Sequence, residues 1–301
     1  MNYDFDCAVI GGGPGGLVSA LYLKRYLRSV VVVNSGIPRA MVIPKTRNLM
    51  GFPNGISGSQ ILSRLTRHLN KLKVDRLAGE ALVTRHRSGF KIKVGNQTPL
   101  IARKVILATG IEDIHPDLDN LKDLRRRGLL RYCPVCDAYD YRNEPVTILA
   151  RDDHGLQKAF FLSRYTRRLH IVVPAALAIA PQRMHELRKL RVRLHRATLR
   201  SIEPSRIKRG VWLCFEDRTP VFSSVVYPML GAVVRDSAFC ELRQLRRSKE
   251  GFLIATTEQR LSIPGMFGVG DCVNLLAQLS VAAGQAAIAA TTIQNDLCAK
   301  E

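Results

Sequence analysis

The sequence is poor in acidic and in aromatic side chains. It has 25 aspartates and glutamates against 46 lysines and arginines, a formal net charge of +21, and only 6% of its residues are aromatic, with a single tryptophan. A protein that binds single-stranded nucleic acid needs aromatic side chains on which bases can stack. The positive charge is concentrated in arginines between residues 125 and 196. Such a field attracts acidic partners, that is nucleic acid, an anionic membrane or an acidic protein, and the alternative is that the helix exteriors are arginine-rich for solubility.

Long apolar runs are missing as well. No uninterrupted apolar stretch is long enough to span a membrane, and a predicted strand begins so near the first residue that a signal peptide has no room. A secreted disulfide framework is also absent, because five of the seven cysteines are scattered along the chain, at Cys7, Cys214, Cys240, Cys272 and Cys298. We therefore expect a soluble, cytoplasmic protein with no membrane segment.

The other two cysteines form a compact motif near the middle of the chain. Cys133 and Cys136 stand two residues apart, and Asp137 follows at once. A thiolate at the start of a helix is stabilised by unpaired N–H groups, and Pro134 suits the first helical position. Asp137 is placed to gain or lose the proton that thiol–disulfide chemistry moves. A structural zinc site needs four ligands, and no second Cys or His pair follows, so the motif indicates a redox-active dithiol and no metal.

The start of the chain has the pattern of a dinucleotide-binding site. A buried strand over residues 6–10 leads into a turn with GxGxxG spacing, and a helix of small residues follows over residues 17–26. In this pattern Gly11 allows the tight turn, Gly13 lets the backbone approach a pyrophosphate, and Gly16 allows the helix to pack closely on the strand. The phosphates then lie at the helix N-terminus.

Two further segments support this interpretation. A second strand, residues 29–33, follows the helix, and Asn34 stands where a carboxylate often binds the ribose; its amide can still form a hydrogen bond there. Another strand ends in Ala108, Thr109 and Gly110, whose small side chains let a flavin or its ADP half lie against the backbone.

These segments together resemble the low-molecular-weight thioredoxin reductase family. The resemblance rests on the glycine-rich start, the GFP and GISG stretches of residues 51–58, the ILATG run ending at Gly110, the CxxCD motif and a late Gly270-Asp271. It covers nearly the whole chain in order. It implies an α/β fold with two Rossmann-like (three-layer ββα) nucleotide-binding domains. The FAD domain is discontinuous, over residues 1–112 and 248–301, and a smaller domain over residues 113–247 carries the cysteines.

The resemblance also implies roles for individual residues. Asp271 binds the ribityl chain of FAD, and Gln278 lies by the helix that covers the flavin ring. Cys136 is the sulfur nearer the flavin, Cys133 is the outer sulfur that meets a partner disulfide, and Asp137 is their acid–base partner. A homodimer is expected from the family. The predicted cofactor-binding residues are Gly11, Gly13, Pro14, Gly16, Asn34, Asn48, Ala108, Thr109, Gly110, Gly270, Asp271 and Gln278.

The inserted segment lacks the second nucleotide motif that the family uses for NADPH. A strand over residues 145–150 and a helix over residues 156–167 are predicted, but Ala150 and Asp152 replace the first two glycines between them. A carboxylate there adds bulk and repels a pyrophosphate. The stretch 174–178, which carries paired arginines in NADPH users, is apolar, and Gly231 is not followed by the family's Pro-Asn.

We therefore expect that NADPH is not a cofactor, although a divergent site built on Arg151 or Arg167 is an open alternative. Three functions follow. The first is reduction of thioredoxin or another protein disulfide, with electrons from an acidic ferredoxin or flavodoxin. The second is a dithiol oxidase that uses oxygen as the acceptor. The third, from another class, is a basic flavoprotein that binds nucleic acid and senses redox state.

Overall fold

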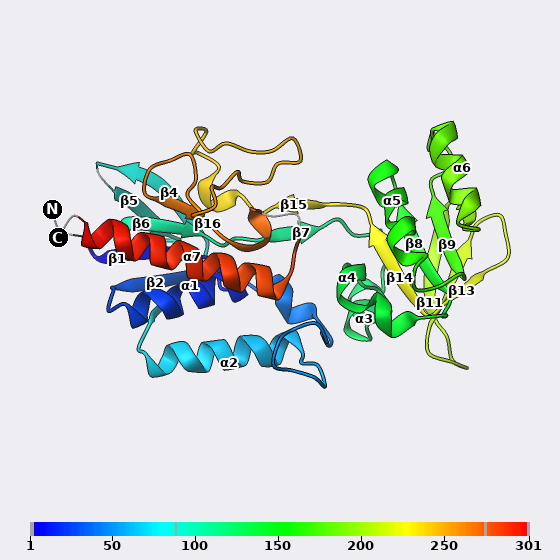
Figure 1. Ribbon diagram of the computed structural model, residues 1–301, viewed down its shortest axis with the longest axis horizontal. Coiled ribbons are helices and arrows are strands. Elements are labelled where there is room, and N and C mark those ends of the chain that lie inside the picture. Colours follow the sequence, from blue (N-terminus) through cyan, green and yellow to red (C-terminus); the bar gives the residue numbers. More distant parts are fainter. Residues whose placement is uncertain (1–2, 88, 274–275, 300–301) are drawn as a thin grey trace. The chain divides into compact units, whose positions relative to one another are not determined.

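The computed structural model describes residues 3–87, 89–273 and 276–299 and divides into two compact units (Figure 1). Unit 1 contains Met1–Lys45, Leu49–Glu112 and Val233–Glu301, and unit 2 contains Thr46–Asn48 and Asp113–Ala232. Each unit is built on a parallel sheet with helices, which confirms the predicted α/β class with two Rossmann-like domains. Within the described residues, no helix is long and apolar enough to cross a membrane.

Unit 1 is a seven-stranded sheet with helices on one face. The strand order is β3-β2-β1-β6-β5-β4, and β16 pairs with the end of β6. Strands β1, β2, β3, β6 and β16 pair in parallel, whereas β4 and β5 form an antiparallel hairpin that joins β6. The strands are β1 (Phe5–Ile10), β2 (Val30–Asn34), β3 (Asp75–Ala78), β4 (Ala81–His86), β5 (Gly89–Val94), β6 (Leu100–Leu107) and β16 (Met266–Gly268).

Alternate residues of the parallel strands fill two cores. Val9 and Val32 face one side of the sheet, against α1, α2 and α7, and Ala8 and Val33 face the other side. A strand buried on both faces must be apolar throughout, which explains the VVVV run of β2. The helices of this unit are α1 (Pro14–Arg25), α2 (Gly58–Lys71) and α7 (Leu279–Cys298), with short 3-10 turns η1 (Arg39–Val42), η3 (Ser237–Phe239) and η4 (Gly270–Cys272).

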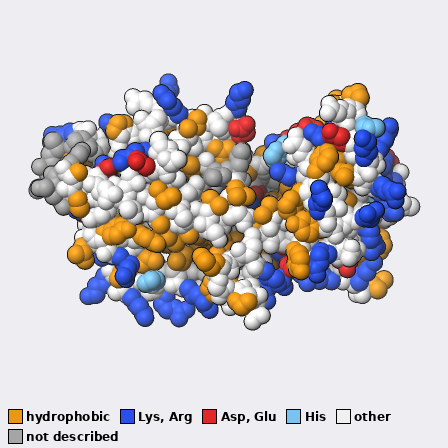
Figure 2. Space-filling model, viewed as in Figure 1, with side chains coloured by type: hydrophobic (Ala, Val, Ile, Leu, Met, Phe, Trp, Pro, Cys, Tyr) orange, Lys and Arg blue, Asp and Glu red, His pale blue; other side chains and the backbone are white. Residues whose placement is uncertain are grey.

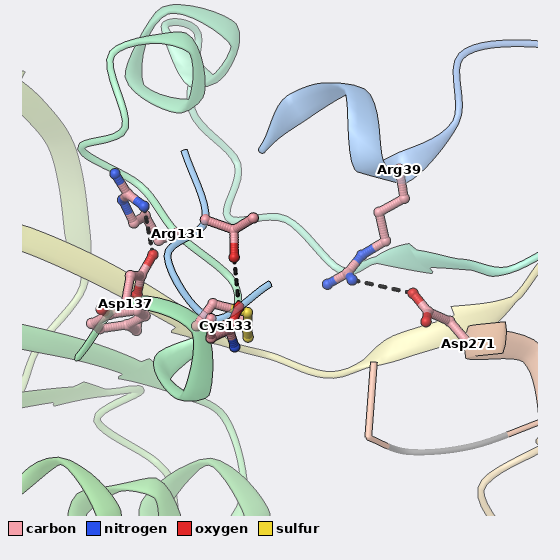
Figure 3. Close-up of a disulfide and its surroundings, with 9 residues drawn as sticks. Arg39, Arg131, Cys133, Asp137 and Asp271 are labelled. Carbon is pink, nitrogen blue, oxygen red and sulfur yellow. Dashed lines mark hydrogen bonds and ion pairs between the residues drawn. A yellow bond between two sulfur atoms is a disulfide. The ribbon is translucent and has the colours of Figure 1, made fainter. Parts of the chain in front are cut away.

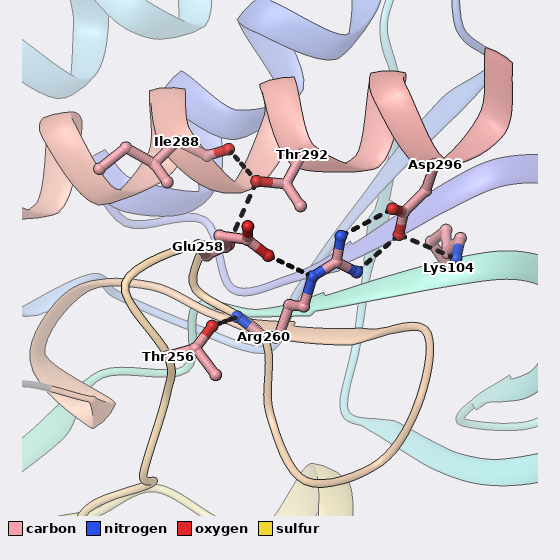
Figure 4. A network of polar contacts seen from close by, with 7 residues as sticks. All are labelled: Lys104, Thr256, Glu258, Arg260, Ile288, Thr292 and Asp296. Carbon is pink, nitrogen blue, oxygen red and sulfur yellow. Dashed lines mark hydrogen bonds and ion pairs between the residues drawn. The ribbon is translucent and has the colours of Figure 1, made fainter. Parts of the chain in front are cut away.

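The C-terminal helix α7 is fixed to the sheet by a cluster of charges (Figure 4). The guanidinium of Arg260 donates to both carboxylate oxygens of Asp296, at 2.8 and 2.7 Å, and to Glu258 at 2.7 Å. Lys104 of β6 lies 3.4 Å from the same Asp296 carboxylate. A paired fork of this kind fixes orientation as well as position, so the helix has one register on the sheet.

The predicted boundary between the domains differs from the structure. Residues 233–247, expected in the inserted domain, belong to unit 1, because Phe239 and Leu245 are buried in the core beneath β4 and β5. The two units are joined by the paired strands β7 (Ile111–Asp113) and β15 (Ala232–Val234). The short segment Thr46–Asn48 belongs to unit 2, where Arg47 forms an ion pair with Asp140.

Unit 2 has three layers around a four-stranded parallel sheet of order β10-β9-β8-β14. Helices α5 and α6 cover one face, with Leu156 and Leu187 in the core. Helix α3 and an antiparallel three-stranded sheet cover the other face, with Leu124 and Leu213 buried there. The elements are α3 (Leu121–Arg126), α4 (Pro134–Asp137), η2 (Ala138–Tyr141), β8 (Val146–Ala150), α5 (Asp153–Leu162), β9 (Leu169–Val173), α6 (Pro181–Lys189), β10 (Arg193–Arg196), β11 (Leu199–Pro204), β12 (Val211–Phe215), β13 (Val221–Ser223) and β14 (Val225–Met229).

Two histidines of neighbouring strands share a hydrogen bond in unit 2. His170 Nδ1 lies 2.9 Å from His195 Nε2, and the rings stack. Burial lowers the pKa of His170 from 6.5 to about 4, helped by the charges of His195, Arg193 and Arg168. Since the unfolded chain takes up this proton first, the free energy of unfolding should fall as pH decreases from about 6.5 toward 4.

We expect this pair to contribute about 2 kcal/mol to the pH dependence, after allowing for solvent screening. Urea denaturation between pH 7 and pH 4 measures it directly. The His170→Asn variant keeps a polar side chain but cannot titrate, so its stability should vary less over the same range. An equal pH slope in the variant and the wild type would contradict this assignment.

Candidate functional site

The glycine-rich turn of unit 1, residues 11–16, follows the carboxyl end of β1, and we call this turn the cradle. Gly11 has φ +122°, and a Cβ on it would lie 2.2 Å from the carbonyl oxygen of Ala108. A Cβ on Gly16 would lie 2.0 Å from the carbonyl oxygen of Gly11. Both positions therefore require glycine, as the motif predicted. Only a residue without a side chain lets β1, β6 and α1 approach so closely.

The space in front of α1 is open. A Cβ on Gly13 would meet nothing within 4 Å, and Gly13 is the N-cap of α1 with no side-chain cap. Pro14 occupies the first turn, and no acidic residue lies there. The first N–H groups of a helix need a partner, and an anion such as a pyrophosphate supplies one.

Asn34 closes the side of the cradle. Its Oδ1 accepts a hydrogen bond from the Gly12 N–H at 3.1 Å, and its Nδ2 donates to the Gly36 carbonyl at 2.7 Å. The structure thus brings Asn34 to the turn, where it orders the glycine backbone.

The ends of β6 and β16 meet at the same edge of the sheet. Thr109 Oγ1, after β6, is buried and has no hydrogen-bond partner in the part of the chain that the structure describes. Gly110 has φ +71° and open space around its α-carbon. An unpaired buried hydroxyl beside open backbone is what a polar ring system laid against this strand would satisfy.

Gly270 and Asp271 follow β16. The Gly270 N–H donates to Gln285 Oε1 at 2.7 Å, and Asp271 lies 3.3 Å from Arg39 Nη1 (Figure 3). Gln285 lies on α7, fifteen residues beyond Gly270. It is nearly buried and fixes the turn that presents Asp271, but the sequence analysis did not select it as a site residue. A buried glutamine in an otherwise alanine-rich helix is the signal that could have identified it.

Of the predicted cofactor residues, only Asn48 lies outside unit 1, and Gln278 is the N-cap of α7 in unit 1. Asn48 belongs to unit 2, where its Oδ1 accepts a hydrogen bond from Thr46 Oγ1 at 2.6 Å. The others, Gly11, Gly13, Pro14, Gly16, Asn34, Ala108, Thr109, Gly110, Gly270 and Asp271, all belong to unit 1.

In unit 2, Cys133 and Cys136 form a disulfide with a Cα–Cα distance of 5.3 Å. Cys133 is the N-cap of α4 and Pro134 takes its first turn, as expected. The helix is only one turn long, however, and continues as the 3-10 turn η2. The expected thiolate stabilisation by a helix dipole is therefore limited to a few local N–H groups.

Asp137 follows Cys136 directly and is paired with Arg131 (Figure 3). Its Oδ2 accepts from Arg131 Nη1 at 2.6 Å and its Oδ1 from the Tyr227 hydroxyl at 2.5 Å. Burial raises the pKa of the Asp137 carboxyl, and the Arg131 charge and the hydrogen bond from Tyr227 oppose that rise.

The corresponding turn of unit 2, between β8 and α5, is closed. Asp152 is the N-cap of α5, and its Oδ1 accepts from the Gly155 N–H at 2.9 Å. Helix α5 starts at Asp153 and ends at Leu162, earlier at both ends than predicted, because this cap begins the helix and the chain turns at residues 163–165. A carboxylate of the chain itself thus occupies the position of a bound anion.

The sequence matches the pyridine nucleotide-disulphide oxidoreductase family from residue 5 to residue 286. The chain belongs to this family. The thioredoxin reductase of Aquifex aeolicus is 24% identical, over 99% of this chain and 94% of that protein. A crystal structure of thioredoxin reductase from Streptococcus pyogenes is 23% identical, with a TM-score of 0.88 and 98% of each chain covered. The crystal structure of HlmI is 25% identical, with a TM-score of 0.87 over 99% of this chain and 94% of that one.

The chain is therefore an FAD-dependent disulfide oxidoreductase of the thioredoxin reductase type, as the motifs predicted. The residues of unit 1 fit the cofactor. The open N-terminus of α1 would hold the pyrophosphate, and Thr109, at the end of β6, would lie beside the flavin. Within the described residues, no cluster of His, Cys, Asp or Glu could hold a metal ion.

The N-caps of α1 and α5 allow a matched test of whether the turn before α1 binds FAD. We expect Gly13→Asp to weaken FAD binding at least 100-fold, because its carboxylate would cap α1 as Asp152 caps α5 and would repel the pyrophosphate. Aspartate is a favourable N-cap, so the fold should not lose stability.

Titration of the apoprotein with FAD, followed by flavin fluorescence, measures the affinity. The control is Asp152→Gly in unit 2, which should leave FAD affinity within twofold of the wild type. Unchanged FAD binding in Gly13→Asp would place the pyrophosphate away from this turn.

Proposed function

We propose that this protein reduces thioredoxin or a similar protein disulfide through Cys133 and Cys136, and that its electrons come from an acidic carrier such as ferredoxin or flavodoxin and not from NADPH. It would work as a cytoplasmic homodimer. FAD, when bound, supplies the two-electron exchange that links the donor to the cysteine pair. Cys136 is assigned as the inner sulfur and Cys133 as the sulfur that attacks the partner disulfide.

The observation that carries the proposal is the capped start of α5. In unit 1 the equivalent helix begins at Gly13 with open space before it. In unit 2 the Asp152 carboxylate occupies that place and Asp153 follows it. Two negative charges within about 4 Å repel by several kcal/mol in a partly buried site. A nicotinamide dinucleotide would have to displace the cap and accept this repulsion.

Two arginines near the start of α5 also make contacts within unit 2. Arg151, at the end of β8, lies over Gly231 after β14, since a Cβ on Gly231 would be 3.2 Å from its guanidinium. Arg183 is held by Asp153 through two hydrogen bonds of 2.7 and 3.0 Å. Arg151 also pairs with Asp152 at 3.6 Å, which argues against a divergent NADPH site on Arg151. The alternative on Arg167, which is exposed, stays open.

The loop after β9 supports the same proposal. Residues 174–178 are apolar, and their backbone is bound by Arg196, which donates to the carbonyls of Ala175 and Leu177 at 3.3 and 2.6 Å. The guanidinium that reaches this loop is thus engaged by the chain itself.

The surface charge of unit 2 suits an acidic protein. Between residues 183 and 209 there are ten lysines and arginines against two glutamates. Arg188, Lys189, Arg191 and Arg193 are exposed, and Figure 2 shows Lys and Arg side chains gathered over this part of unit 2. Such a field speeds the encounter with an acidic carrier and makes its rate dependent on salt.

Anaerobic absorbance spectroscopy tests the electron source. We expect micromolar NADPH to leave the flavin band near its starting height over minutes, whereas reduced ferredoxin or flavodoxin bleaches it within seconds. The rate with the carrier should fall as salt rises from low to physiological ionic strength. Rapid bleaching by NADPH would refute the proposal. Oxygen uptake driven by a dithiol, with hydrogen peroxide as product, would instead assign the oxidase direction.

The cysteine roles have their own test. Cys133→Ser or Cys136→Ser should abolish turnover of a disulfide substrate while FAD remains bound, because the FAD cradle belongs to unit 1. Flavin content by absorbance and turnover with a chromogenic disulfide are the two measurements. Cys240→Ser, which removes an exposed cysteine of unit 1, is the matched control and should turn over normally. Activity in either of the first two variants would rule out this pair.

A further inference from the structure

The hairpin between β11 and β12 carries exposed side chains that the proposed function does not use. Its tip, residues 205–210, presents Arg206, Ile207, Lys208 and Arg209, all exposed, and we call this segment the basic tip. Ile207 is 93% exposed and stands between two of the cations. An apolar side chain surrounded by positive charge is typical of the contact surfaces that proteins use to bind one another.

The only tryptophan of the chain lies on the same small sheet. Trp212 of β12 is 38% exposed and pairs across the strands with Phe222 of β13, with the ring centres 5.3 Å apart in an edge-to-face arrangement. The other face of these strands, with Ile202 and Leu213, is buried in the core of unit 2. The aromatic pair therefore lies on the outer face of the sheet, next to the basic tip.

The basic tip is held in one shape. The Ser205 N–H donates to the Gly210 carbonyl at 2.9 Å and closes the turn. Gly210 has φ +149°, and a Cβ there would lie 2.4 Å from the Phe222 ring, so the ring rests directly on the backbone. Lys208 Nζ lies 3.7 Å from the centre of the same ring. A surface that is already ordered loses little conformational entropy when a partner binds to it.

Positive charge dominates this hairpin. Residues 199–215 contain four cations, one of which is Arg200 of β11, and one carboxylate, Glu203, which stands opposite Trp212. The remaining three cations all belong to the basic tip. A partner that matches this surface in charge is acidic.

The basic tip comes close to the segment that carries the cysteines. Burial raises the pKa of Tyr141, and the charges of Arg131 and Arg209 oppose that rise, so Arg209 is near enough to act on this hydroxyl. Tyr141 ends the 3-10 turn η2, which directly continues the cysteine helix α4. Val135, between the two cysteines, is 51% exposed. The basic tip and the disulfide loop are thus neighbouring surface features of one unit.

We propose that the basic tip and Trp212 form the docking surface for the protein disulfide that this enzyme reduces, and that this substrate is acidic around its disulfide. The inference rests on the proposed role of Cys133 and Cys136, and it names the class of their substrate. Opposite charge speeds the encounter, and the contact with Ile207 slows dissociation.

Docking at this surface serves a balanced exchange. The Cys133 thiolate attacks one sulfur of the substrate disulfide and forms a mixed disulfide, and the other substrate sulfur leaves as a thiol. Cys136 then displaces the second substrate sulfur. The substrate gains two electrons and two protons, and the Cys133–Cys136 bond forms again.

Two synthetic disulfide peptides with the same ring test the charge preference. One is flanked by glutamates and the other by lysines, and neither contains an aromatic residue. The enzyme is reduced anaerobically with dithionite and mixed with each peptide in a stopped-flow instrument, and flavin reoxidation gives the rate. We expect the glutamate peptide to react about tenfold faster at low salt.

The variant Arg206→Gln/Arg209→Gln should lose most of this preference, leaving a ratio of about two. The matched control is Arg200→Gln/Arg218→Gln, which removes the same charge from the opposite end of β12 and should keep the wild-type ratio. Equal rates for the two peptides in the wild type would overturn the proposal, and so would an unchanged ratio in the first variant. Dithionite replaces the electron donor, so a result with NADPH or ferredoxin has no bearing on this outcome.

Emission from Trp212 measures docking apart from the redox step. Titration of the oxidised enzyme with the oxidised glutamate peptide should shift this emission, and Ile207→Ser should weaken binding about fivefold without a change of charge. Binding of the glutamate peptide without its reduction would refute the function proposed for the cysteines and leave the docking surface in place. Tighter binding of a thymidine oligonucleotide than of the glutamate peptide, lost in Arg206→Gln/Arg209→Gln, would overturn the proposal in favour of nucleic acid.

Discussion

A helix that follows a parallel strand leaves its first N–H groups without partners, and the two units meet this requirement in opposite ways. In unit 1 the groups at the start of α1 face open space beyond Gly13, and a cofactor must satisfy them. In unit 2 the Asp152 side chain accepts a hydrogen bond from one of them, the Gly155 N–H. The strand–turn–helix arrangement therefore occurs twice in the chain, once with an open helix start and once with a helix start capped by the chain's own carboxylate.

Local patterns predicted the glycine turn of unit 1 correctly. The glycines at Gly11 and Gly16 could be assigned from spacing because the reason for them is local, a close approach between β1, β6 and the first turn of α1. The loss of the second glycine motif, between β8 and α5, could also be read from the sequence, but the structural role of the residue that replaces a glycine could not. The sequence indicates only that Asp152 obstructs a phosphate, whereas the structure shows that it caps α5.

The residues that sequence reasoning missed act across long separations. Gln285 reaches Gly270 from α7, and Tyr227 reaches Asp137 across ninety residues. No periodicity or spacing rule connects such pairs, because only the folded sheet brings them together. The predicted domain boundary at residue 247 was wrong for the same reason. The residues after Val233 look like the end of the inserted segment, yet Phe239 is buried in the core of unit 1.

The divided construction of unit 1 has a consequence for biosynthesis. Its central strands are made first, but Gly270, Asp271 and α7, with the Asp296 that anchors it, are the last parts of the fold to leave the ribosome. Unit 2 is almost contiguous in the chain, so it can fold while unit 1 still lacks its final strand, β16. Every segment of unit 2 therefore precedes Gly270 and Asp271 in the chain, so the cofactor-binding part of unit 1 is completed only after unit 2 has been synthesised.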